Sequence, residues 1–338
     1  MTRELRLSRR PLLFPGLPTT EHAPTAMAGM ERFVTPIFRA MQHVRLAHNL
    51  WTQRRPLSVV SSCGATLGEV AVWESFGIQV RYESSDTCEP GPRFAIANFG
   101  HRLSHYFKAH KYQILGTGPC WMHPGLTCRS ELLQSGKPVD LRTAGFPCKP
   151  YTQWRQCDGA PGARSAGRPE DHPDYNVMMK DESLFLQSHP EIDRVLYEQV
   201  GGFAKTDEHG GSPLKRFSAM LRSHGFTGVQ AVWLNSSDAQ STSRRRLYIA
   251  GYKERVGGTR AAKAWAHRVS EIVKFLNMMP KATLFGDIIS HQDMMSARTS
   301  QLLERQDRRA HCGLAPALCA HTLCPITVFA CTMCSVKR

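Results

Sequence analysis

The residue in this chain best placed to act as a nucleophile is Cys148, which directly follows Pro147 and has a second proline shortly after it. An extended-looking run, residues 138–144, comes just before it. Because prolines end regular secondary structure, the thiol is expected on a rigid turn after a strand, where open α/β sheets collect ligands and reacting groups. Lys149 and Arg142 are close enough in sequence to lower the pKa of this thiol and activate it, although an isolated Pro-Cys pair is more often structural.

Two later parts of the chain offer groups that a cysteine nucleophile needs. Glu198 stands near the end of residues 192–200, which read as a strand. Arg244 and Arg246 lead into an apolar strand. Each feature has an ordinary explanation, a solvated strand end for the acid and a basic sheet edge for the arginines. Together they would supply a proton donor and positive charge to a nucleophilic reaction.

An earlier stretch, residues 57–86, reads as strand, small-residue loop, helix, strand and terminal acid. This order is typical of the nucleotide-binding half of a doubly wound α/β sheet. Small residues such as Gly64 and Gly68 would let the backbone approach a cofactor, and an acid would accept hydrogen bonds from ribose hydroxyls. The sequence leaves open whether Glu83 or Asp86 is that acid.

These features share one resemblance. Residues 145–151, Gly-Phe-Pro-Cys-Lys-Pro-Tyr, resemble the Gly-Phe-Pro-Cys-Gln-Pro-Phe loop of the cytosine-C5 DNA methyltransferases. Residues 198–200 resemble that family's Glu-Asn-Val motif, and Arg244 and Arg246 fall on the two arginines of its Gln-x-Arg-x-Arg motif. The resemblance covers roughly residues 57–252. It implies a Rossmann-like class I methyltransferase fold, with a mostly parallel doubly wound sheet and flanking helices.

The resemblance also implies a DNA (cytosine-5-)-methyltransferase that uses S-adenosylmethionine. Cys148 would add to C6 of the base while Glu198 acts on N3, and Arg244 and Arg246 would orient the base and the carboxylate. Pro147 would form the wall between the cysteine and the methyl donor. The expected partner is double-stranded DNA with the target cytosine flipped out of the helix. The cofactor contacts implied are Gly64, Gly68, Glu83, Asp86 and Pro147.

Several departures from the family's pattern keep other functions open. Val60 stands where a phenylalanine is usual, Cys63 and Ala65 occupy glycine positions, and Thr242 replaces a glutamine. The closing Asn-x-Val segment has no counterpart, which predicts a C-terminally incomplete catalytic domain. One alternative is a tRNA cytosine-C5 methyltransferase, although the Cys-Phe-Thr signature of that branch is missing. The other is a catalytically inactive relative that binds DNA or a protein partner.

Composition limits the class of protein. The 338 residues are 41% hydrophobic and 21% charged, which is ordinary for a globular chain. The formal net charge of +15 favours a polyanionic partner. No run approaches the roughly 18 apolar residues that cross a bilayer, so no membrane partner is expected. Eleven cysteines without a disulfide-framework spacing indicate a reducing compartment.

The domain prediction has four parts. Residues 1–54 are a basic arm, 55–258 the catalytic domain, 259–295 a helical extension and 296–338 an irregular cysteine-containing tail without an assigned domain. The extension begins with a packing helix expected at 261–279. A DNA substrate and the basic arm together predict a nuclear location if the source is eukaryotic.

No metal is expected. Cys120, His123 and Cys128 are soft ligands close together in sequence, but no fourth ligand follows at a suitable spacing, so they are interpreted as ordinary loop residues. The cysteines of the tail follow no common zinc pattern either.

Overall fold

A computed structural model of the chain describes residues 55–75, 78–134, 136, 138–151, 172, 174–175, 177–206, 211–235 and 244–277. The predicted arm, the predicted tail and Thr242 lie outside these residues.

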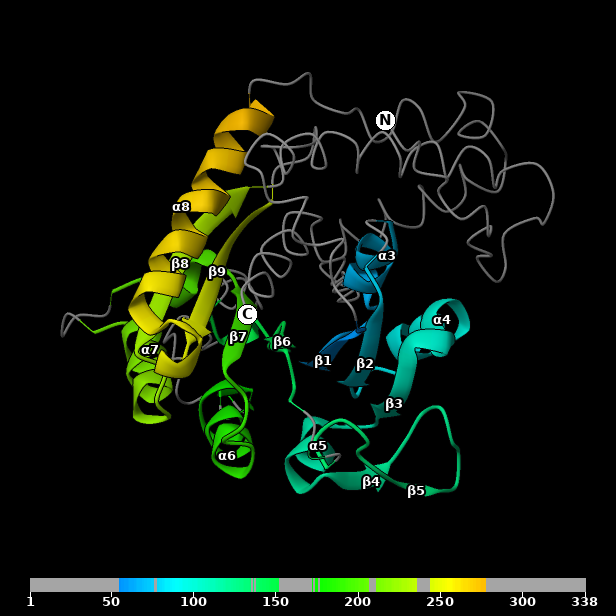
Figure 1. Ribbon diagram of the computed structural model, residues 1–338. Coiled ribbons are helices and arrows are strands. Elements are labelled where there is room, and N and C mark those ends of the chain that lie inside the picture. Colours follow the sequence, from blue (N-terminus) through cyan, green and yellow to red (C-terminus); the bar gives the residue numbers. More distant parts are fainter. Residues whose placement is uncertain are drawn as a thin grey trace, which may run out of the picture.

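The described chain is built on a seven-stranded sheet with the order β3-β2-β1-β6-β7-β9-β8 (Figure 1). Its strands are β1 (Leu57–Ser62), β2 (Val80–Ser85), β3 (Leu103–Phe107), β6 (Leu141–Ala144), β7 (Arg194–Gln199), β8 (Gly228–Asn235) and β9 (Arg245–Tyr252). Neighbouring strands from β3 to β7 pair in parallel, and β9 pairs antiparallel with both β7 and β8. This is the Rossmann-like sheet of the class I methyltransferases, so the predicted fold class is confirmed.

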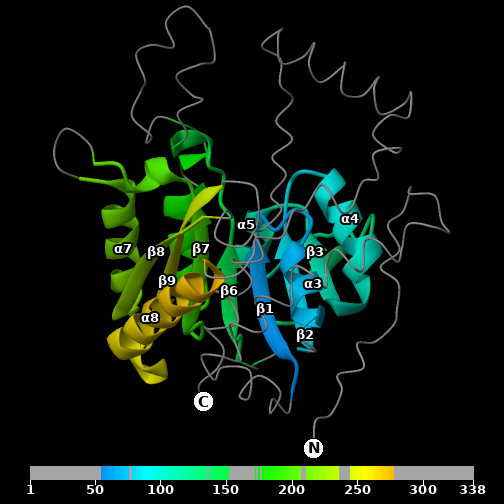
Figure 2. The same ribbon diagram turned by 90° about the horizontal axis from the view of Figure 1, so that it is seen from above.

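Helices cover both faces of the sheet (Figure 2). On one face lie α3 (Gly68–Ser75), α4 (Pro90–Phe99) and α8 (Gly258–Asn277), and on the other lie α5 (His110–Leu115), α6 (Glu182–Ser188) and α7 (Pro213–Ser223). Strand β7 shows why both faces need cover. Its Val195 and Tyr197 pack with α6 and α7, while the intervening Leu196 packs with α3 and α8, because successive strand residues point to opposite faces.

Shorter elements connect these layers. Strands β4 (Thr117–Pro119) and β5 (Thr127–Arg129) form a separate antiparallel pair beside β3. A π-helical turn, Val177–Asp181, leads into α6. Four 3-10 turns are Gly100–Arg102, Lys149–Tyr151, Gly201–Ala204 and Glu254–Val256.

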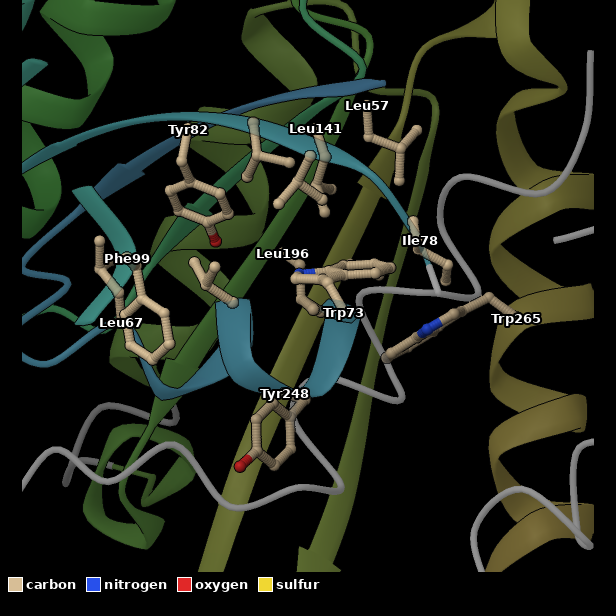
Figure 3. Close-up of a cluster of buried hydrophobic side chains, with 14 of the residues drawn as sticks. Leu57, Leu67, Trp73, Ile78, Tyr82, Phe99, Leu141, Leu196, Tyr248 and Trp265 are labelled. Carbon is tan, nitrogen blue, oxygen red and sulfur yellow. The ribbon is translucent and has the colours of Figure 1, made fainter. Parts of the chain in front are cut away.

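The larger part of the core lies under α3 and α8 (Figure 3). Trp73 of α3 and Trp265 of α8 are both almost fully buried there. Val269 and Ile272 follow Trp265 on the same face of α8, which confirms the predicted packing helix. Burying side chains of this size contributes about 1.5–3 kcal/mol each. The predicted boundary at residue 258 therefore falls at the start of a helix that shares the core of the sheet.

The second strand of the predicted nucleotide-binding half extends further than expected. It runs on to Ser85, so Glu83 lies inside β2 and not after it. Strand β3 and helices α4 and α5 were not predicted. Among the described helices, none combines the length and the apolar character that crossing a membrane requires.

Candidate functional site

The Pro-Cys turn lies directly after strand β6, as predicted. The backbone N–H of Gly145 donates to the carbonyl oxygen of Ser62 at the end of β1, with an N···O distance of 3.3 Å. Cys148 starts the short turn Lys149–Tyr151, in which the Tyr151 N–H donates to the Cys148 carbonyl at 2.9 Å. The thiol is partly exposed. A fixed turn thus presents Cys148 at the carboxyl edge of the sheet, and Pro147 precedes it in the same turn.

The second motif leaves the sheet beside the first. Ala144 is the register partner of Tyr197, so the turn after β6 and Glu198 of β7 emerge at the same edge. The Gln199 amide donates to the Phe146 carbonyl at 3.3 Å and ties the two motifs together. A Cβ on Gly202 would lie 1.8 Å from the carbonyl oxygen of Tyr151, so only glycine allows this contact.

Glu198 is held by an arginine from a third strand. Arg246 Nε lies 3.2 Å from Glu198 Oε1, and the glutamate side chain is 10% exposed. Burial raises the pKa of Glu198, while the charges of Arg244 and Arg246 oppose that rise. Because β9 is antiparallel to β7, its beginning lies at the edge where the parallel strands end. The structure therefore brings together Glu198 and both predicted arginines.

One of the two positive charges expected near the thiol, that of Arg142, is engaged elsewhere, which corrects the prediction for this residue. Its guanidinium donates to both carboxylate oxygens of Glu182, at 3.1 and 2.6 Å, and both side chains are fully buried. The Tyr197 hydroxyl donates to the same carboxylate at 2.6 Å. Arg142 also stacks over the Phe185 ring. This ion pair joins β6 to α6, and the Tyr197 hydroxyl joins β7 to the same carboxylate.

The loop after β1 has an unusual backbone. Cys63, Ala65 and Leu67 all have positive φ angles, of 54°, 42° and 51°. Glycine adopts this left-handed conformation without strain, whereas other residues pay about 1–2 kcal/mol. Two of the three were predicted to occupy glycine positions, and the structure keeps the glycine-like backbone there. A Cβ on Gly64 would meet Leu67 and Ser84 at 2.6 Å, so this part of the loop has no room for a side chain.

Neighbouring elements hold that loop in place. The Tyr106 hydroxyl of β3 donates to the Ala65 carbonyl at 2.8 Å, and the Ala65 N–H donates to Asp86 Oδ2 at 3.0 Å. A Cβ on Gly91 of α4 would lie 2.9 Å from the Ala65 backbone. Beside Gly68, by contrast, a Cβ would meet nothing within 4 Å. The result is a pinned loop with open space at the start of α3.

The two candidate acids, Glu83 in β2 and Asp86 just after it, have different surroundings. Glu83 is fully buried, and it accepts hydrogen bonds from the Ser130 hydroxyl at 2.6 Å and from the N–H groups of Glu131 and Leu132. Asp86 is partly exposed and accepts from the Ala65 N–H in the loop after β1. A carboxylate has about four acceptor positions, so Asp86 can also accept from ribose hydroxyls. Of the two candidates, Asp86 fits an adenosyl cofactor and Glu83 anchors the chain after β5.

Sequence reasoning missed Glu69. Burial raises its pKa to about 7, and the Tyr82 hydroxyl donates to it at 2.9 Å. The charge of Glu198 contributes to the same rise, so this carboxyl connects the loop after β1 with the acid of β7. No sequence signal marks it, because acids in the first turn of a helix are usually exposed.

Comparison with known proteins leaves the family unassigned. No protein-family profile and no curated protein match the sequence. Similar solved structures include the METTL16 methyltransferase domain (13% identity, 63% of this chain and 81% of that one, TM-score 0.36). A putative RNA methyltransferase from Pyrococcus horikoshii is 11% identical over 64% of this chain and 83% of that one, with a TM-score of 0.31. A SAM-dependent methyltransferase from Agrobacterium tumefaciens is 14% identical over 61% of this chain and 59% of that one, with a TM-score of 0.35. At these TM-scores the likenesses carry no argument, and the fold assignment depends on strand order.

Proposed function

We propose that this protein is an S-adenosylmethionine-dependent methyltransferase that modifies C5 of cytosine in double-stranded DNA. The observation that carries the proposal is the meeting of three motifs at one sheet edge. The Cys148 turn follows β6, Glu198 ends the paired strand β7, and Arg246 of β9 lies 3.2 Å from that glutamate. These motifs are separated by about 50 residues each in sequence, and their common position at one sheet edge supports cytosine-C5 chemistry.

The proposed roles follow from the chemistry of the base. Cytosine C5 is a weak nucleophile, so the Cys148 thiolate first forms a bond to C6. Glu198, whose pKa is raised by burial, donates a proton or hydrogen bond to N3 and draws electron density into the ring toward C5. Arg246 fixes the orientation of the glutamate. After methylation, loss of the C5 proton lets the Sγ–C6 bond break and returns the thiolate.

The methyl donor would lie over the pinned loop after β1. S-adenosylmethionine would supply an electrophilic methyl group when bound there. Asp86 would accept hydrogen bonds from the ribose, and the open space beside Gly68 leaves room for the ligand at the start of α3. The strained backbone at Cys63, Ala65 and Leu67 supports this assignment, since such strain persists where a site needs a particular loop shape.

The net charge of +15 supports a nucleic acid as the partner, because phosphate attraction needs no sequence recognition. The choice of DNA follows the resemblance of the Cys148 turn to the DNA-modifying family. A flipped base would have to enter between the Cys148 turn and Glu198, at a cost of a few kcal/mol for unstacking.

The test is covalent trapping. A duplex containing 5-fluorocytosine, incubated with the full chain and S-adenosylmethionine, should give an adduct that survives denaturation, since fluorine at C5 blocks the release of the cysteine. Cys148→Ser should form none, and Cys88→Ser, at an exposed cysteine, should form as much as the parent.

Three results would change the proposal. Adduct formation only with a fluorinated RNA would move the substrate from DNA to RNA. Retained donor and duplex binding without any adduct would make the chain an inactive relative. An adduct with Cys148→Ser equal to the parent's would disprove the nucleophile.

A further inference from the structure

Four potential metal ligands converge beside the sheet edge, away from Cys148. The ligand atoms of His105, Cys120, His123 and Cys128 all lie within 4.8 Å of one another. We propose that they form a structural zinc site that joins the edge strand β3 to the β4–β5 hairpin. The sequence interpretation had three of these residues and no fourth, because His105 stands fifteen positions before Cys120 on a different strand.

The spacing of the four atoms suits a tetrahedral ion. With Zn–S bonds of about 2.3 Å and Zn–N bonds of about 2.0–2.1 Å, the edges of a tetrahedral site are about 3.3–3.8 Å long. Cys128 Sγ lies 3.3 Å from His123 Nδ1, and Cys120 Sγ lies 4.0 Å from His105 Nδ1. The four groups therefore already stand at nearly the separation that one zinc ion would impose.

The sulfur of Cys120 is held in place by the backbone. The N–H groups of Tyr106 and Met122 both point at it, each with an N···S distance of 3.4 Å. The residue is 1% exposed. Hydrogen bonds from outside the ligand set are a usual way in which a protein orients a metal-binding side chain.

A carboxylate stands near one of the two histidines, and its other oxygen accepts from Arg81. Glu131 Oε1 lies 4.0 Å from His105 Nε2, on the ring nitrogen opposite the one that faces Cys120. A carboxylate behind a ligating histidine is a common way to fix the ring and raise its basicity toward zinc. Two histidines and two cysteines fill all four positions of a tetrahedral ion, so the proposed site is structural and leaves no place for a substrate.

The position of the four residues indicates what the ion would stabilise, namely the β4–β5 hairpin beside β3. In the hairpin, residues 117–129, the buried side chains that the structure describes are Cys120 and Cys128, two of the proposed ligands, while Trp121 and Met122 are only partly buried against the core. Between the proposed ligands, the Trp121 indole donates to the carbonyl of Asp86 at 2.9 Å. Just after Cys128, the Ser130 hydroxyl donates a hydrogen bond to the carboxylate of Glu83. Zinc would thus fix the segment that contacts the carboxylate of Glu83 in β2 and the backbone of Asp86 just after it.

The first experiment measures metal in the full chain. Protein purified from zinc-supplemented medium should contain about one equivalent of zinc, and the Cys120→Ser/Cys128→Ser double variant should contain less than about a tenth of that. Cys88→Ser is the matched control and should keep the metal. A variant in which all five tail cysteines are serine should keep it too, which separates this site from Cys312, Cys319, Cys324, Cys331 and Cys334.

A second measurement uses the parent chain, so its outcome does not depend on whether a variant folds. Cobalt(II) added to the metal-free parent should give the strong visible and thiolate charge-transfer bands of a tetrahedral two-sulfur site. Chelation should lower the melting temperature by several degrees, and zinc should restore it. Weak octahedral bands, full zinc content in the double variant, or loss of zinc only in the tail variant would each overturn the proposal. None of these readouts requires methyltransferase activity.

Discussion

The two halves of the sheet edge solve different problems. On one side, after β6 and β7, the groups that matter are side chains, namely the thiol of Cys148 and the carboxylate of Glu198, with Arg246 beside it. On the other side, after β1 and β2, backbone shape dominates, through a loop in which Cys63 and Ala65 adopt glycine-like angles. The first half has the residue types of the family that the sequence resembles. The second half has glycine-like backbone angles at positions where the residues are not glycine.

This difference explains why sequence motifs are uneven guides. A side chain that forms a bond has no chemical substitute, so its identity is visible in the sequence. A backbone angle can be imposed by surrounding contacts, here the Tyr106 hydroxyl and the Asp86 carboxylate on Ala65, at a cost of about 1–2 kcal/mol per residue. The departures at the loop after β1 are therefore compatible with a working cofactor site.

The largest expected effect separates the two halves directly. Glu198→Gln should lower kcat by about 10²–10⁴-fold, the usual contribution of a positioned proton donor, and leave the dissociation constant for S-adenosylmethionine unchanged. Asp86→Ala should leave kcat unchanged and weaken donor binding about 10–100-fold, because hydrogen bonds to a charged group are lost. Single-turnover kinetics and calorimetric titration measure the two quantities.

The control for that pair is Glu83→Gln, at the buried acid of β2. Its donor affinity should match the parent's, because Ser130 and not a ligand occupies this carboxylate. If Glu83→Gln weakens donor binding as much as Asp86→Ala does, the assignment of the ribose acid is wrong.

A medium effect tests how the halves are coupled through Glu69. Its pKa is about 7 in the folded chain against 4.5 ordinarily, so the folded state holds a proton that the unfolded state releases between these values. Stability from this group is complete below pH 4.5 and is lost as the pH rises to about 7, a total of about 3 kcal/mol. Glu69→Gln should remove this slope, so its free energy of unfolding should exceed the parent's at pH 8 and match it near pH 4.

Denaturant titrations at several pH values measure that slope. An equal pH dependence in Glu69→Gln and the parent would contradict the buried, protonated carboxyl. In Glu198→Gln the part of the slope that comes from Glu69 should persist but move to slightly lower pH, since one neighbouring negative charge is gone, while the part that comes from the raised pKa of Glu198 itself should be lost.

The smallest effect concerns the strained loop. Ala65→Gly should raise the free energy of unfolding by about 0.5–1 kcal/mol, because the relief of the left-handed strain exceeds the added entropy of the unfolded glycine. Ala97→Gly, at an exposed position of α4, should instead lower it by about 1 kcal/mol. Thermal unfolding of the parent and the two variants measures these changes in stability. A loss of stability in Ala65→Gly would argue against strain at this position.

Much of the architecture was accessible from the sequence. Strands β1, β2, β6, β7 and β9 and helices α3 and α8 correspond to predicted elements, because apolar periodicity and glycine or proline boundaries mark them. Helix α4 opens with Pro90, Gly91 and Pro92, which obscure any helical period. Strand β3 and helix α5 are short, and each has a histidine and other polar residues. Those elements gave no pattern to find.

By itself, the sequence determined which side chains can do chemistry, because Cys148, Glu198, Arg244 and Arg246 are defined by residue type and by their order on strand ends. The tertiary structure decided where charges and contacts go. It paired Arg142 with Glu182, buried Glu83 against Ser130, left Asp86 partly exposed beside Ala65 and placed His105 beside Cys120. These outcomes depend on which strands become neighbours and in which register, and such long-range pairing leaves no local trace in the chain.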